Sequence, residues 1–147
     1  MLKVSNFPGG GGAIKNLGKL NINKSTFKSN TATNSYSVRG GAVVNSNDTE
    51  ITNIHFMNNS ALGSGGAVKI WYSCKYLIKD STFENNTVNE FGGAVDFDNL
   101  IKRDWYSSDP GITQGNNYNA SLINIQFLNN HAKWVVLLKF MEELSMP

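Results

Sequence analysis

The chain has 147 residues, of which 16% are charged, and its 13 basic and 11 acidic side chains give a formal net charge of +2. One domain is expected at this length, and the near balance of charge excludes strong electrostatic attraction to nucleic acid or to an anionic membrane. The single cysteine, Cys74, excludes an intrachain disulfide. No run of residues approaches the roughly 18 apolar positions of a membrane-spanning helix, so no membrane span is predicted.

The first repeated feature along the chain is Gly-Gly-Ala followed by an aliphatic residue. It occurs four times, with successive glycine pairs 29, 25 and 27 residues apart. Its four copies are Gly11-Gly12-Ala13-Ile14, Gly40-Gly41-Ala42-Val43, Gly65-Gly66-Ala67-Val68 and Gly92-Gly93-Ala94-Val95. A period of this length indicates a repeated supersecondary unit and not four separate domains.

A second motif, Phe-x-x-Asn-x-Ala, alternates with the first and has Val88 in the last place of its third copy. Its Phe and Asn positions are Phe27 and Asn30, Phe56 and Asn59, Phe83 and Asn86, and Phe127 and Asn130. Aliphatic residues stand five positions before each Phe, at Ile22, Ile51, Ile78 and Leu122. This spacing predicts strands with one inward face, interrupted by a bend at Lys24, Asn53, Asp80 and Asn124.

A unit of this size cannot bury its own apolar face and must stack on its neighbours. Stacking in register predicts a parallel β-helix of about four coils, whose strands are roughly 4.8 Å apart. We expect the four Phe to form one interior column, the Ile and Val residues another, and the four Asn a ladder at a corner where asparagine tolerates the left-handed backbone. The glycines are expected to supply positive φ and to leave room for adjacent coils.

The fourth unit departs from the repeat, because a long insertion separates Val95 from Leu122. We predict an inserted loop at about 96–119 and treat it as a candidate ligand-binding loop, since long loops on a rigid scaffold often carry function. Its candidate residues are Asp96, Asp98, Arg103, Trp105 and Tyr106. A solvated insertion without function is the alternative.

Asp96 and Asp98 lie two positions apart on a predicted strand and therefore share its outward face. The outward column there contains Lys15, Val44, Lys69 and Asp96. A cross-coil ion pair on a solvated face is a simpler interpretation of this column than a metal site or an acid/base pair. We therefore predict no catalytic residue, no metal site and no cofactor.

Residues 133–147 break the repeat and are predicted to be a capping tail that follows a repeat domain at 1–132. The sequence WVVLLKFM, from Trp134 to Met141, is compatible with a short helix or with a strand. Either form would cover the open edge of the last coil.

The alternation of Gly-Gly-Ala-[Ile/Val] with Phe-x-x-Asn resembles the repeat of the polymorphic outer membrane proteins of chlamydiae. The Asn-rich stretches NKSTFKSNTATN and DSTFENNTVNEFGGAV are more similar still to adhesin-like surface proteins of methanogenic archaea. This resemblance covers most of the chain and implies a right-handed parallel β-helix of the pectin lyase-like type, in an extracellular, surface-attached protein. The first residues, MLKVSNFPGGGG, lack the apolar core of a signal peptide, and we expect the rest of a longer parent chain to provide export and anchoring.

The predicted function is an adhesin-like structural and binding module without catalytic activity, whose partner is a glycan or protein on a host or neighbouring cell. A polysaccharide-active β-helix lyase or hydrolase is the alternative, and it requires Asp96, Asp98, Lys69 and Arg103 to meet in one groove. A non-functional fragment of a larger surface protein is a third interpretation.

Overall fold

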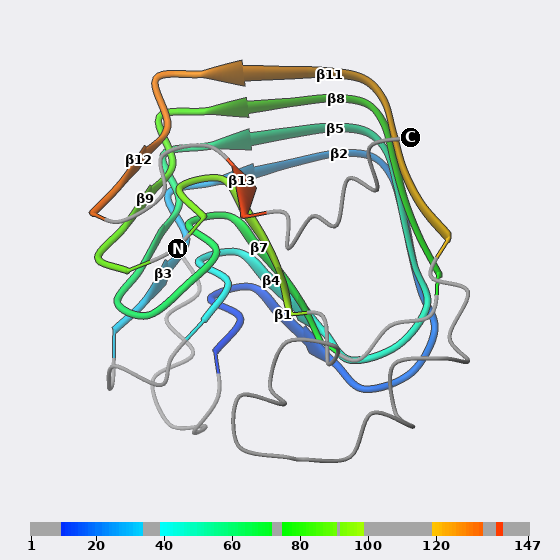
Figure 1. Cartoon of the computed structure of the whole chain (residues 1–147), viewed down its shortest axis with the longest axis horizontal. Helices are drawn as coiled ribbons and strands as arrows, with labels where there is room; N and C mark the ends of the chain where they lie inside the picture. The colour runs from blue at the N-terminus through cyan, green and yellow to red at the C-terminus, as the bar shows by residue number, and fades with distance from the viewer. Residues whose placement is uncertain are drawn as a thin grey trace, which may run out of the picture.

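The computed structural model describes residues 10–33, 39–71, 75–90, 92–98, 119–133 and 138–139. In these ranges the regular secondary structure consists of β-strands, which form three parallel sheets. Each of four successive coils contributes one strand to each sheet, and residues 138–139 add a fifth strand to one of them. Strands that are distant in sequence lie directly above one another (Figure 1). The predicted parallel β-helix is therefore confirmed.

The first sheet contains a short strand from each Gly-Gly-Ala motif. Its strands, in order, are β1 (Ile14–Asn16), β4 (Val43–Asn45), β7 (Val68–Trp71), β10 (Val95–Asp98) and β13 (Leu138–Lys139). The position of β13 shows that the tail contributes a strand at 138–139, where it pairs in parallel with β10. Of the two forms predicted for the tail, the strand is the one found at these residues.

The other two sheets are built from the segments around each Phe and Asn. The second sheet is formed by the long strands, which are stacked from bottom to top in Figure 1. In this order they are β2 (Leu20–Lys28), β5 (Thr49–Met57), β8 (Lys75–Glu84) and β11 (Asn119–Leu128). The third sheet contains β3 (Thr31–Ala32), β6 (Ser60–Ala61), β9 (Thr87–Val88) and β12 (His131–Ala132).

The strand register places residues from the same motif position above one another, as the repeat spacing predicts. Phe27, Phe56, Phe83 and Phe127 form one column, in which successive rings stack with centroids 5.1, 4.8 and 5.3 Å apart. Val43, Val68 and Val95 form a second column that is fully buried. Phe56 and Phe83 are also fully buried, because a coil covers each of them on both sides.

The two glycines of each pair have different structural roles. The first glycine has positive φ in all four copies, for example +63° at Gly40 and +68° at Gly65. The second allows close contact between coils, since a β-carbon at Gly66 would lie 2.0 Å from the carbonyl oxygen of Gly93. The same β-carbon would lie 2.9 Å from the backbone of Thr87 in the third sheet. The backbone of Gly66 therefore packs directly against the backbone of Thr87, with no room for a side chain between them.

The asparagine ladder is present and runs through all four coils. The side-chain amide Nδ2 of Asn30 donates to Oδ1 of Asn59 at 2.9 Å, Asn59 donates to Asn86 at 2.9 Å, and Asn86 donates to Asn130 at 2.8 Å. Each accepting oxygen also receives a backbone N–H, at 3.0 Å. The amide of Asn86 further donates to the carbonyl of Phe56 at 3.1 Å, so the ladder also joins the end of the long strand.

The expectation that these asparagines adopt the left-handed backbone is wrong. Positive φ belongs to the preceding residue in each coil: Ser29, Asn58, Asn85 and Asn129, with φ between 53° and 56°. The left-handed residue turns the chain, and this lets the next side chain point along the stack. The bend predicted at Lys24, Asn53, Asp80 and Asn124 is confirmed, since all four have positive φ, between 48° and 55°.

Candidate functional site

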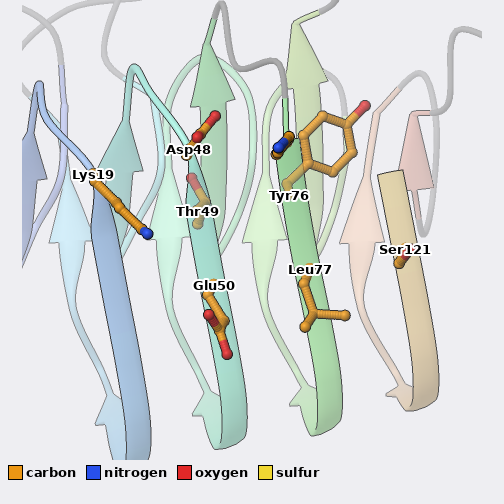
Figure 2. Close-up of a pocket in the computed structure, with 8 residues that line it drawn as sticks. Lys19, Asp48, Thr49, Glu50, Tyr76, Leu77 and Ser121 are labelled. Atoms are coloured by element: carbon orange, nitrogen blue, oxygen red, sulfur yellow. The ribbon is translucent and has the colours of Figure 1, made fainter. Parts of the chain in front are cut away.

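A polar groove crosses the coils where the long strands of the second sheet begin. It encloses about 390 Å³ and is lined by Lys19, Asp48, Thr49, Glu50, Lys75, Tyr76, Leu77 and Ser121. These residues come from four successive coils, so the groove runs along the stack of strands (Figure 2). Its volume lies within the range of pockets that hold small ligands.

The charges of the groove form a column set by strand register. Leu20 pairs with Thr49, and Thr49 pairs with Tyr76, so the residues immediately before them, Lys19, Asp48 and Lys75, follow one another along the stack. The column therefore alternates positive, negative and positive. Figure 2 shows the side chain of Lys19 extending toward β5.

A buried asparagine holds the turn that carries Asp48. Asn45 is fully buried, and its Nδ2 donates to the carbonyl of Asn47 at 2.8 Å and to Oγ1 of Thr49 at 2.7 Å. The Thr49 hydroxyl in turn donates to the Asn47 carbonyl at 2.9 Å. These bonds fix the chain from the end of β4 to the start of β5, and the Asp48 side chain is therefore held at the groove by a rigid turn.

The groove offers both hydrogen-bond donors and acceptors around a small apolar surface. Within the described part of the chain, the Lys19 ammonium and the Asp48 carboxylate form neither a hydrogen bond nor an ion pair. Glu50 accepts a long bond, 3.4 Å, from Nδ2 of Asn21. Tyr76 is 8% exposed, and Leu77 beside it is half-buried. The arrangement suits a ligand with hydroxyl groups on its edge and carbon on its face.

The structural motif residues predicted from sequence belong to the scaffold of the coil. The aromatic and asparagine members line the interior and the third-sheet corner: Phe56, Phe83, Phe127, Asn59, Asn86 and Asn130. The Gly-Gly-Ala members precede the first-sheet strands, and their second glycines pack against the backbone of the third sheet: Gly40, Gly41, Ala42, Gly65, Gly66, Ala67, Gly92 and Gly93. They position the groove but do not line it.

The candidate loop residues are placed only in part. Asp96 forms an ion pair with Lys69, with Nζ and Oδ2 2.5 Å apart and both side chains 3% exposed. The expectation of a solvated face is therefore wrong at this pair, because alternation along a strand shows which residues share a face but not whether that face is covered. The side chain of Asp98 lies outside the description, as do Arg103, Trp105 and Tyr106.

The insertion nevertheless re-enters the fold beside the groove. Asn119, its last residue, pairs with Lys75 in the register of β8 and β11, and Ser121 is a lining residue. Residues 72–74, also outside the described ranges, end immediately before Lys75. The described chain therefore resumes at the groove after both of these segments.

Sequence reasoning missed the groove because its members are not close in the chain. A signal is nonetheless present, since Lys19, Asp48 and Lys75 each stand three positions before the aliphatic residue of the repeat, Ile22, Ile51 or Ile78. Comparing the non-repeating side chains at one motif position would have revealed this column.

Two further properties concern the described residues. No group of three or more His, Cys, Asp or Glu side chains in these ranges is placed to bind a metal ion. The same ranges contain no helix long and apolar enough to cross a membrane.

The fold defines the protein as a parallel β-helix built from a short repeat. The family model of the Chlamydia polymorphic membrane protein repeat matches residues 53–70 and 80–98, which include two copies of the Phe, Asn and Gly-Gly positions. The chain thus carries this repeat, which associates it with a class of surface membrane proteins. Neither the curated proteins nor the solved structures gave a match.

Proposed function

We propose that the chain is a non-catalytic binding module of an extracellular, surface-displayed protein, and that its groove at Lys19, Asp48 and Lys75 binds a glycan. The observation that carries this proposal is a groove lined by charged and polar side chains from four successive coils, on a repeat scaffold of surface proteins. The interior of the coil is filled by stacked, mostly apolar side chains, so recognition must use side chains on the outside.

A saccharide fits this groove better than an extended protein surface does. The lining provides carboxylates and hydroxyls that accept hydrogen bonds, lysines that donate them, and Leu77 as an apolar contact. Stable protein interfaces instead use large surfaces with aromatic or arginine anchors. Weak saccharide contacts would add together where many copies of the module are displayed on one surface.

The alternative of a polysaccharide-active enzyme finds less support. That activity would need Lys69 and Asp96 in an open groove, and both side chains are 3% exposed. A carboxylate without solvent access cannot reach a polymer chain in the described arrangement. We therefore favour binding without cleavage.

The test uses the full chain displayed in many copies on fluorescent beads and applied to an array of defined oligosaccharides. We expect binding to a subset of the array, and at least a tenfold loss on combining Lys19→Gln with Asp48→Asn, which removes both charges and keeps similar size. Lys79→Gln is the matched control, because Lys79 is exposed and lies outside the groove lining.

Equal binding by the groove variant and the parent chain would place recognition elsewhere. Absence of binding to every oligosaccharide would reject the glycan assignment and leave a protein ligand as the alternative. Incubation of bound oligosaccharides with the chain should release no new reducing ends, and their appearance would contradict the non-catalytic role.

A further inference from the structure

The ion pair between Lys69 and Asp96 joins two adjacent coils at a buried position. The two residues are direct register partners in β7 and β10, and Nζ of Lys69 lies 2.5 Å from Oδ2 of Asp96. Both side chains are 3% exposed, and the neighbouring Val44 and Ile70 are 2% and 1% exposed. A lysine and a carboxylate are thus held together away from bulk water.

A glycine of the repeat helps to hold the carboxylate in place. A β-carbon at Gly92 would lie 2.8 Å from the β-carbon of Asp96, so the glycine backbone packs directly against the aspartate side chain. This close packing fixes the position from which the Asp96 side chain extends toward Lys69.

The pair also has an unsatisfied atom. Oδ1 of Asp96 is buried and has no hydrogen-bond partner among the described residues. A buried carboxylate normally satisfies both oxygens, and two buried charges are costly unless their remaining hydrogen-bonding groups are paired. A neutral group in place of the two charges would remove most of this cost.

We propose that Lys69 and Asp96 condense to an intramolecular amide that covalently joins the third and fourth coils. The ammonium of Lys69 transfers a proton to the Asp96 carboxylate, and the resulting amine attacks Cγ through its lone pair. A second Nζ proton moves to the departing oxygen, the C–O bond breaks, and one water leaves. Ammonium and carboxylate thus give one amide and one water, with charge balanced and no oxidant or cofactor consumed.

Proximity and exclusion of water are the physical basis of this step. Holding two reacting groups in contact makes an otherwise bimolecular reaction effectively unimolecular. Burial also removes the hydration that stabilises both ions, so the neutral amine and carboxylic acid that react are less disfavoured than they are in water. The exposed pair Lys79 and Asp80, with 3.8 Å between Nζ and Oδ2, lacks both conditions and should not react.

The resulting link would close a loop of chain between positions 27 residues apart. Such a link restricts the unfolded chain more than the folded one and thereby resists unfolding. It would also fix β10, the strand that precedes the long insertion, to the regular coils before it.

The test is intact-mass spectrometry of the full chain, purified from a folded preparation and measured under denaturing conditions. We expect a mass lower than the sum of its residues by one water. Tandem mass spectrometry of a digest should find a branched peptide that joins the segments containing Lys69 and Asp96. Lys69→Arg, which keeps the charge but has a poorly nucleophilic guanidinium, should show the full mass, and Lys79→Arg should still lack one water.

Two results would overturn the proposal. One is the full, unmodified mass in a wild-type preparation whose strand content is verified by circular dichroism. The other is a loss of water that persists in Lys69→Arg, because an aspartyl succinimide also lacks one water but has no branch. If Lys69→Arg fails to fold, the presence or absence of the branched peptide in the wild-type digest decides the question.

Discussion

Replacing Asn86 by alanine tests whether the asparagine ladder holds the coils together. Its Oδ1 accepts from the backbone N–H of Asn59 at 3.0 Å and from its Nδ2 at 2.9 Å. Its own Nδ2 donates to the carbonyl of Phe56 at 3.1 Å and to Oδ1 of Asn130 at 2.8 Å. Asn86→Ala therefore removes four hydrogen bonds from a residue that is fully buried.

The magnitude follows from what remains after the substitution. A net contribution of about 1 kcal/mol per bond and the cost of buried groups left without partners give a loss of about 3–5 kcal/mol. A domain of this size has only about 5–15 kcal/mol of stability, so the variant should be close to unfolding. The free energy of unfolding is measured by urea titration followed by circular dichroism.

Asn30→Ala is the matched control at the first described coil. The Asn30 side chain is half-buried and makes one ladder bond, to Oδ1 of Asn59, which keeps the backbone N–H of residue 30 as a donor. We expect a loss of about 1 kcal/mol or less. Equal losses in the two variants would show that the ladder bonds do not set stability and would refute this reasoning.

Two further predictions concern the scaffold. Gly66→Ala should abolish the soluble folded chain, because its β-carbon would lie 2.0 Å from the Gly93 carbonyl oxygen. In the control variant Gly18→Ala the new β-carbon meets nothing within 4 Å, so the soluble yield and the urea midpoint should not change. Similar soluble yields of the two variants would contradict the prediction. Lys69→Met leaves the Asp96 carboxylate buried alone, so it should be about 3–5 kcal/mol less stable in the same titration than the double variant with Asp96→Leu, which buries no charge at this position. Equal stability of these two variants, neither of which can form the amide, would contradict a buried-charge cost.

Most of the fold could be predicted because the coils stack in register, so the repeat period alone determines which residues lie above one another. Once Phe56 and Phe83 occupy the same position of the repeat, they must lie in one column, and the structure places their ring centroids 4.8 Å apart. The ladder follows from Asn59 and Asn86 in the same way. The alternation of the two motifs thus determined both the sheets and their order.

What could not be predicted depended on neighbours outside the repeat. The repeat predicts the left-handed backbone conformation at Asn59, but the structure has it at Asn58. The reason is that the side-chain amide of Asn59 points along the stack to Asn86, while the preceding residue turns the backbone. Both residues are asparagine, so residue type alone could not separate them. Burial of Lys69 is likewise not given by the repeat, because alternation along a strand assigns a side chain to a face but does not say whether that face is exposed.

The candidate site could not be predicted from the two motifs, because its residues do not belong to either of them. The motif positions repeat because their side chains stack in columns, as the four Phe and the four Asn do, and these positions therefore carry little information specific to one coil. The position before each long strand faces outward and is free to vary, and it reads Lys19, Asp48 and Lys75 in three successive coils. On such a scaffold, we expect ligand specificity to depend on the order of residues along an outward-facing column. A ligand that recognises this column must span several coils, so exchanging Lys19 and Asp48 would keep the net charge of the groove and still change which ligand it binds.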